Sequence, residues 1–289
     1  MARSAIALLL TLALLLGARP VAVRAQDATS AASPAAQAAG GTAGTPVSAA
    51  SPDVLLTTTF PAALLPKGPA SVEFWTWSWD PGEQYFAEAY HPTVSVGGDL
   101  VLAGAYGTRS DGDVIAWRDG RFQTVPLDQE IVLSTDEAVI YLDNVANEWF
   151  RNAGDTTTEL ASFAITLGDD FQGPNLGVDW EKSGLSGHDV TVTIDRQTLA
   201  PGETLPPSSP NPTAPTVRIV EDGELTWAAT RPGDQEAAPA VRFPKGATVP
   251  FVVPTEGGRV ALSNTGDTPL VLLTLTLASA GNAASTPVS

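Results

Sequence analysis

Residue types that carry most enzyme chemistry are scarce in this chain. It has 289 residues, two histidines (His91 and His188) and no cysteine. The absence of cysteine excludes thiol nucleophiles, thiolate metal sites and iron–sulfur ligation. The run Gly184–His188 lacks the second glycine of a nucleophile elbow and has no strand–turn–helix context, so we interpret it as a connecting segment. We therefore predict no catalytic residue.

The sequence still contains candidate ligands for one metal site. His91 could bind a divalent metal with Glu148, and Glu83 or Glu88 could add a third ligand. Such a site needs three converging ligands and an open coordination position. The alternative is that His91 is an ordinary loop residue beside Pro92 and Glu148 a solvated strand residue, because a lone histidine among freely spaced acids is common.

A row of tryptophans is the second candidate. Trp75, Trp77 and Trp79 alternate along a run rich in β-favouring residues, so a regular strand places them on one face. Such a row could stack on a sugar or another flat ligand. The alternative is packing between sheets or between domains, because large aromatic side chains dominate cores and interfaces. Four further aromatic residues could extend the row: Tyr85, Phe86, Tyr90 and Trp149.

The N-terminal segment is typical of an export signal. Arg3 precedes an apolar run from Ala5 to Gly17, and Val23 and Ala25 are small residues where a signal peptidase reads. The run is shorter than the roughly 20 residues of a membrane span, although an uncleaved anchor stays an alternative. Cleavage would leave 12 basic and 32 acidic residues, a net charge of −20. We expect a secreted or extracytoplasmic protein without a membrane span after cleavage, and this charge disfavours nucleic acid as a partner.

Composition divides the rest of the chain. Residues 26–52 consist almost entirely of Ala, Ser, Thr, Gly and Pro, and residues 279–289 are similar, so both are expected to be disordered. Between them we expect strands at 72–79, 189–199 and 271–277, and no amphipathic helix of ordinary length. Asp119-Gly120 predicts a hairpin with a type I′ turn. The pattern indicates an all-β sandwich or barrel.

An internal repeat organises these strands. The Pro-Gly turn at 80–83 recurs at 200–203, and the His-Pro-Thr run at 91–93 recurs as Asn-Pro-Thr at 211–213. The run at 97–100 (Gly-Gly-Asp-Leu) matches 222–225, with five extra residues in the second copy, and the run at 152–156 matches 264–268. We interpret the Gly-rich landmarks as turns. The repeat predicts two tandem domains, 53–170 and 171–278.

This order of turns and strands, over residues 70–280, resembles the cupin family in its two-domain (bicupin) form. The resemblance implies two tandem double-stranded β-helix (jelly-roll) barrels, after a signal peptide at 1–25 and a linker at 26–52. The resemblance also implies that the protein could form a homodimer. In cupins that do chemistry, a divalent metal such as Mn, Fe, Zn or Ni binds in the barrel mouth through two histidines, a glutamate and a further histidine.

Here the cupin ligand pattern is degenerate. His91 has no His-x-His pair, and Glu148 stands four residues before Asn152, where the last histidine of the family belongs. Val260 occupies the corresponding place in the second copy, which has no recognisable ligand set. The resemblance therefore leaves only His91 and Glu148 as metal candidates, both in the first barrel.

We interpret the chain as an exported cupin-domain protein that is non-catalytic and free of metal or other cofactors. It would act as a small-molecule-binding or structural module, with Trp75, Trp77, Trp79 and Tyr90 as ligand-binding residues. One alternative is a metal-dependent enzyme of the oxygenase or isomerase type in the first barrel. The other is an extracellular protein-interaction module that docks through the tryptophan row.

Overall fold

In a computed structural model, the described residues are 51–87, 94–142, 148–167, 175–205, 214–230, 239–251 and 259–280. They belong to one compact unit, 47–289. They form nineteen strands and one 3-10 turn, η1 (Ala62–Leu64), and every strand pairing is antiparallel. The all-β expectation is confirmed. No helix in these ranges is long and apolar enough to cross a membrane.

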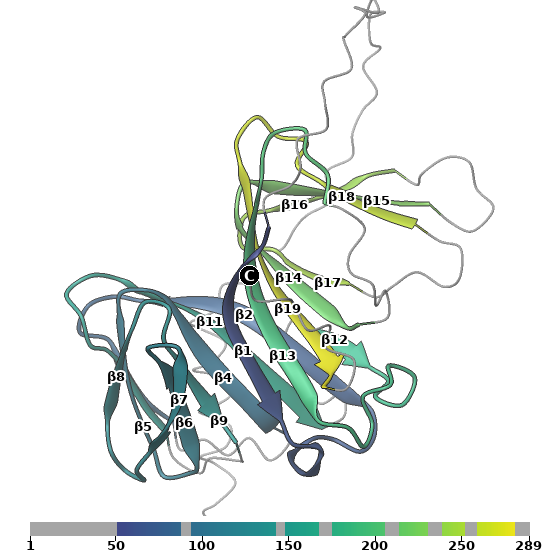
Figure 1. Ribbon diagram of the computed structural model, residues 1–289. Coiled ribbons are helices and arrows are strands. Elements are labelled where there is room, and N and C mark those ends of the chain that lie inside the picture. Colours follow the sequence, from purple (N-terminus) through teal and green to yellow (C-terminus); the bar gives the residue numbers. More distant parts are fainter. Residues whose placement is uncertain are drawn as a thin grey trace, which may run out of the picture. The chain divides into compact units, whose positions relative to one another are not determined.

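Barrel 1 is built from two sheets (Figure 1). The first sheet contains, in spatial order, β12 (Asn175–Val178), β2 (Ala70–Trp79), β11 (Thr158–Leu167), β4 (Val94–Ala103), β9 (Ala138–Tyr141), β6 (Val114–Arg118) and β7 (Arg121–Val125). The second contains β3 (Gln84–Ala87), β10 (Glu148–Asn152), β5 (Ala105–Ser110) and β8 (Ile131–Ser134). Apolar side chains of both sheets, such as Val101 and Phe150, pack together inside the barrel.

Barrel 2 repeats this plan. Its first sheet contains β1 (Asp53–Phe60), β13 (Val190–Leu199), β19 (Leu270–Ser279), β14 (Thr216–Asp222) and β17 (Thr248–Phe251). Its second contains β16 (Val241–Pro244), β15 (Glu224–Thr230) and β18 (Arg259–Ser263). A single bridge between Thr204 and Ser263 stands where barrel 1 has β3. The interior cluster of barrel 2 is smaller and includes Leu199, Val220 and Leu272.

The strand orders make both barrels double-stranded β-helices. In barrel 1, the order β2-β11-β4-β9 is paired with the order β3-β10-β5-β8. In barrel 2, the orders β13-β19-β14-β17 and β18-β15-β16 follow the same connectivity. The predicted pair of jelly-roll barrels is therefore confirmed by the topology of the chain itself.

The largest apolar cluster joins the outer faces of the two first sheets. It includes Phe74 and Phe163 from barrel 1 and Val192 and Leu275 from barrel 2, all at most 2% exposed. Two strands also cross the expected division of the chain, because β1 pairs with β13 and β12 pairs with β2. The domain limits 53–170 and 171–278 stay a prediction.

One predicted turn of the repeat is wrong. Residues 97–100 lie inside β4, where a Cβ on Gly98 would come 2.7 Å from the carbonyl oxygen of Val139. The residue that corresponds to Gly223 is Gly104, since each has φ +80° between two consecutive strands. Gly104 and Gly223 are 119 positions apart, so the expected five-residue insertion before this landmark is also wrong.

Two other landmarks are confirmed as turns and have the same geometry in both barrels. At the Pro-Gly turns, the backbone N–H of Asp80 donates to Glu83 (2.7 Å), and that of Ala200 donates to Glu203 (2.8 Å). Asn152 Nδ2 donates to the carbonyl oxygens of Trp79 and Thr156. Asn264 Nδ2 donates to the equivalent oxygens in barrel 2. In both barrels the asparagine Oδ1 accepts from the backbone N–H two residues further on.

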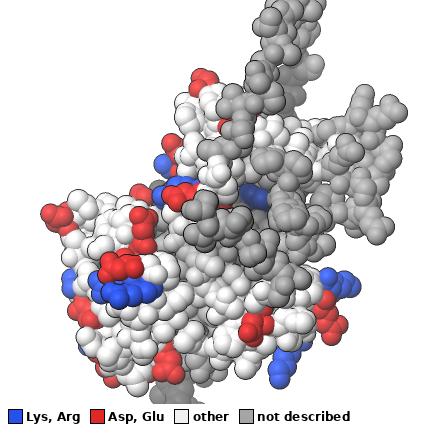
Figure 2. Space-filling model, in the orientation of Figure 1, with Lys and Arg blue, Asp and Glu red and all other residues white. Residues whose placement is uncertain are grey.

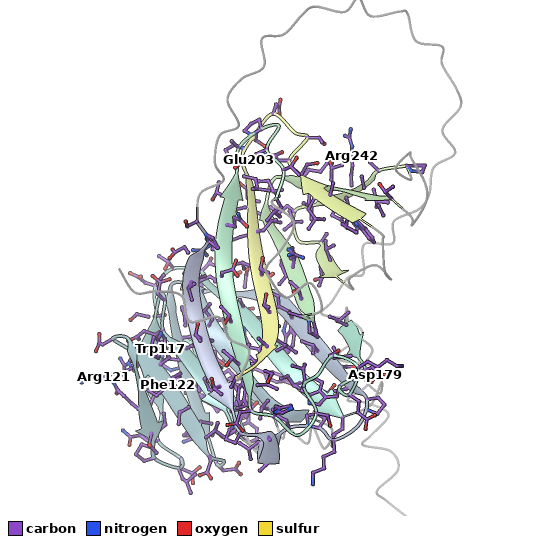
Figure 3. All side chains as sticks on the ribbon, turned by 45° about the vertical axis from the view of Figure 1, so that its right-hand side comes forward. Trp117, Arg121, Phe122, Asp179, Glu203 and Arg242 are labelled. Atoms are coloured by element: carbon purple, nitrogen blue, oxygen red, sulfur yellow. The ribbon has the colours of Figure 1, made fainter. Side chains whose placement is uncertain are left out.

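The chain as a whole is acidic, with 32 Asp and Glu against 15 Lys and Arg. Acidic and basic side chains are interspersed on the face drawn in Figure 2. The predicted hairpin is confirmed as β6–β7, because Asp119 and Gly120 have positive φ angles of 51° and 71°. At its end Trp117 and Phe122 lie against each other, with ring centroids 4.8 Å apart (Figure 3).

Candidate functional site

The three tryptophans of β2 lie in one row on the inner face of barrel 1. Successive ring centroids are 6.1 and 6.0 Å apart, with edge-to-face geometry. Trp79 continues the row to Phe150 of the opposite sheet. The expectation of one shared face is confirmed. Trp77 is 40% exposed and Trp75 half-buried, so the row reaches solvent, while its ligand binding stays a prediction.

Beneath this row, Asp99 forms the centre of a hydrogen-bond network. Its Oδ2 accepts from the hydroxyls of Tyr106 (3.1 Å) and Tyr141 (3.0 Å), and its Oδ1 accepts from Ser162 (2.5 Å). Ser162 in turn accepts from Trp77 Nε1 at 2.7 Å. An unbroken chain of hydrogen bonds thus connects the exposed indole to a carboxyl that is 6% exposed.

Burial raises the pKa of Asp99, and the three hydroxyl hydrogen bonds only partly offset this shift. The same desolvation, together with the charge of Asp99, raises the pKa of Tyr106 and Tyr141 well above 10. Both phenols therefore stay protonated and act as donors.

Glu148 and Glu73 add two carboxyls to the same inner face. Glu148 follows the parity of the buried Phe150 on β10, and burial plus the charges of Asp99 and Asp111 raises its pKa to about 8. Glu73 precedes Trp75 by two positions on β2 and is 1% exposed. Burial raises its pKa to about 7, although Thr166 donates to its Oε1 at 3.3 Å. Its Oε2 has no hydrogen-bond partner among the described residues.

The other predicted aromatic residues are distributed over different faces. Tyr85 pairs with Phe150 on the inner side and is 49% exposed, so it lies at the rim of the same face as the tryptophan row. Phe86 pairs with Trp149, and this pair has the opposite parity, so it does not extend the row. Trp149 instead lies near two guanidinium groups, those of Arg109 and Arg151. Tyr90 lies outside the described residues.

The described donor set of barrel 1 does not fit a metal ion. No group of three His, Asp or Glu side chains converges within the described ranges. Asp99 already accepts three hydroxyl hydrogen bonds, so both of its carboxyl oxygens have partners. His91, the other predicted ligand, lies outside the described residues. No chemical step is therefore derived through a metal.

The corresponding positions of barrel 2 carry a different set of groups. Ser162 of β11 pairs with Trp75 on one side and Asp99 on the other, whereas Thr274 of β19 pairs with Asp195 and Arg218. Arg218 is 4% exposed. Burial lowers its pKa to about 10 and raises that of Asp195 to about 6, and the opposite charge of each partner counteracts the shift.

A pocket of about 520 Å³ lies between the two barrels. Barrel 1 contributes Ser78 and Glu159, among others, and barrel 2 contributes Arg196 and Glu221. Both basic side chains of the pocket face acids within it. Arg196 donates twice to Glu221, at 2.7 and 2.8 Å, and Lys245 lies 3.7 Å from Asp222. The sequence pattern did not predict this pocket, because its walls come from seven separate segments of the chain.

Comparisons with known proteins give similarity in strand arrangement alone. No family model matches the chain, and no curated protein matches its sequence. A tryptophan-to-phenylalanine variant of oxalate decarboxylase from B. subtilis is 13% identical, with a TM-score of 0.41 over 77% of this chain and 79% of that chain.

Two further solved structures have comparable scores. The oxalate decarboxylase of Lactobacillus farciminis, in a formate complex, is 11% identical, with a TM-score of 0.40 over 78% of this chain and 83% of that chain. A cupin 2 conserved barrel domain protein from Leptotrichia buccalis is 13% identical, with a TM-score of 0.34 over 80% and 98%. The fold assignment rests on the strand order described above, and none of these structures assigns a function to this chain.

Sequence reasoning missed Asp99 and Glu73 as site residues. Two glycines precede Asp99, and this pattern predicts a turn rather than an inward-facing strand position. Glu73 could have been predicted, because it is an acid in the alternation Glu73-x-Trp75-x-Trp77 and therefore shares the inward face of the two tryptophans. An acid at such a position is buried when the strand pairs on both sides, and β2 pairs there with β11 and β12.

Proposed function

We propose that this protein is an exported, cupin-type binding protein without catalytic activity or a resident metal. Its ligand is a small organic molecule that contacts the inner face of barrel 1. The observation that carries this proposal is the solvent-accessible tryptophan row, which is joined through Trp77 and Ser162 to the buried Asp99. Aromatic side chains that provide contact area beside a few fixed polar groups are typical of small-molecule sites.

The hydroxyl network supports binding rather than chemistry. Asp99 accepts three hydrogen bonds, so its carboxylate is held in place, and the phenols that donate to it stay protonated. Catalysis by a general base requires a group free to take a proton from substrate. Asp99, which three hydroxyl groups already contact, lies instead beside an accessible aromatic surface.

A thermal-shift screen of the mature protein tests the binding proposal. We expect one chemical class among neutral, anionic and cationic compounds to raise the melting temperature, because a ligand that binds only the folded state stabilises it. The shift should be lost in the double variant Trp75→Leu/Trp77→Leu and kept in Trp149→Leu, which removes an indole from the outer face of β10. A screen in which no compound class stabilises the protein would overturn the proposal.

Two direct measurements test the remaining parts. Elemental analysis of protein purified without chelator should find no stoichiometric Mn, Fe, Zn or Ni, and a near-equimolar metal would favour the enzyme alternative with His91 and Glu148 as ligands. Mass spectrometry of the exported protein should give a chain that begins at Gln26. A retained N-terminal segment would replace cleavage with an anchor.

A further inference from the structure

The inner face of barrel 1 has an imbalance of charge. Glu73, Asp99 and Glu148 reach it from three different strands, β2, β4 and β10. No Lys, Arg or His among the described residues contributes to the pKa of any of them, and the only charges that act on Glu148 are acidic. Burying carboxyls without a counter-charge is costly unless they are protonated or meet a cation.

Glu73 gives an independent sign that a partner is missing. Its side chain is 1% exposed and lies on the tryptophan side of β2, and its Oε2 has no hydrogen-bond partner among the described residues. Native structures satisfy nearly all buried polar atoms, so an unsatisfied buried carboxyl oxygen marks a place for a donor or a positive charge.

The accessible part of this face is aromatic. Trp77 and Tyr85 are 40% and 49% exposed, and Trp75 and Glu148 are half-buried. Indole and phenol rings attract a cation through their negative faces, and several rings around one carboxylate form the kind of surface that binds substituted ammonium groups. Neutral flat ligands would use the rings but would bring no positive charge to Glu148.

Barrel 2 shows what the same scaffold does with an internal cation. Where barrel 1 has Trp75 and Asp99 on either side of Ser162, barrel 2 has Asp195 and Arg218 on either side of Thr274. The Arg218 guanidinium opposes the burial-induced rise in the pKa of Asp195. Barrel 2 thus supplies its own positive charge, Arg218. In barrel 1 the position that corresponds to Arg218 is Asp99, and Trp75 stands where barrel 2 has Asp195.

We infer that barrel 1 binds an organic cation, a substituted ammonium compound, between the Trp75–Trp77 row, Tyr85 and Glu148. This inference rests on the proposed binding function and names its ligand class. A hard divalent metal is a poorer occupant, because the described carboxyls do not converge on one point. An anion would be repelled by whichever of the three carboxyls is ionised.

Calorimetric titration of the mature protein with choline and with its neutral isostere, 3,3-dimethyl-1-butanol, tests the charge requirement directly. The two compounds have nearly the same shape, so a difference in affinity reports the charge. We expect choline to bind at least about tenfold more tightly at about pH 9, above the raised pKa of Glu148 of about 8, since the rings and the ionised carboxylate both favour the positive charge. Ionic strength is held constant with sodium chloride.

Four variants locate the site. Trp77→Leu and Glu148→Gln should each weaken choline binding by at least about threefold, because each removes one contribution to cation binding. Trp149→Leu, on the outer face of the same strand as Glu148, and the exposed Glu159→Gln are matched controls and should change affinity less than about twofold. Circular dichroism melting curves confirm that each variant is folded.

The outcomes separate the inference from the proposed function. Equal binding of choline and the isostere would overturn the cation inference and leave the binding function supported. Stabilisation by neutral or anionic compounds alone, with no choline binding, would overturn it in the same way. Failure of every compound class in the screen would overturn both. Choline binding that the control variants weaken as much as the site variants would place the cation elsewhere and overturn the assignment.

Discussion

The interiors of the two barrels differ in chemistry although their central strands follow the same order. Both carry the same Pro-Gly-Glu turn and the same asparagine hydrogen bonds. At matching interior positions, barrel 1 has carboxyls held by hydroxyl groups, and barrel 2 has opposite charges, Asp195 and Arg218. The difference teaches that turns and strand order maintain the fold, while the inward side chains are free to diverge in function.

The buried charge of barrel 2 should give the largest effect. We expect Arg218→Met to lower the free energy of unfolding by about 3–5 kcal/mol, because it leaves Asp195 without its opposite charge. The double variant Asp195→Leu/Arg218→Met should recover most of this loss. Urea unfolding measures both, with the exposed Arg242→Met as a control. A cost below about 1 kcal/mol would mean that these charges do not hold barrel 2 together.

The buried carboxyl Glu73 of barrel 1 should make the free energy of unfolding depend on pH. The folded pKa of Glu73 is raised to about 7 from 4.5, so the folded state holds the proton more tightly than the unfolded state. The contribution of Glu73 to the free energy of unfolding is therefore greatest below pH 4.5. It falls as the pH rises to about 7 and is constant above that pH. Relative to wild type, Glu73→Gln should gain up to about 3 kcal/mol between pH 4.5 and 8.

Urea unfolding at a series of pH values measures this difference, and the exposed Glu159→Gln provides the control. An identical pH slope in wild type and Glu73→Gln would show that Glu73 ionises as freely in the folded protein as in the unfolded chain.

The asparagine turns should respond equally in the two barrels. Asn152 and Asn264 are 4% and 1% exposed, and each side chain makes three backbone hydrogen bonds. We expect Asn152→Ala and Asn264→Ala each to cost about 2 kcal/mol, because buried backbone groups lose their partners. Chemical denaturation compares them. Costs that differ by more than about 1 kcal/mol would break the structural equivalence of the barrels.

The smallest effect is expected at the Pro-Gly turns. Gly82 and Gly202 have φ of +83° and +80°, and an added Cβ meets no atom within 4 Å at either position. Gly82→Ala and Gly202→Ala should each cost about 1 kcal/mol from backbone strain alone. Gly177→Ala, in β12 with open space and no positive φ, should be near neutral in the same thermal melts. A neutral result at Gly82 would mean that its turn relaxes to another conformation.

Local chemistry predicted much of the skeleton. The alternation at 72–79 and 189–199 corresponds to β2 and β13, and Asp119-Gly120 forms the expected hairpin turn. The glycine pair at 97–98 does not form the expected turn, although two adjacent glycines are typical of one. In the fold they lie flat between β11 and β9, where neighbouring backbones leave no room for a Cβ.

Part of the candidate site could also be predicted. One face for Trp75, Trp77 and Trp79 follows from the two-residue period of a strand. Asp99 could not be connected with them, because its hydrogen bonds reach Ser162, 63 positions along the chain, and Tyr141, 42 positions along. Contacts over such distances depend on which strands pair.

The sequence by itself determined the duplication, the Pro-Gly and asparagine turns and the strand-rich body, because these depend on residues that are neighbours along the chain. Only the tertiary structure decided that Glu73, Asp99 and Glu148 share the inner face of barrel 1. It also decided that Asp195 and Arg218 share the inner face of barrel 2. Burial and pairing between distant strands set the pKa of each carboxyl and the balance of charge in each barrel. The ligand class proposed for barrel 1 follows from that balance.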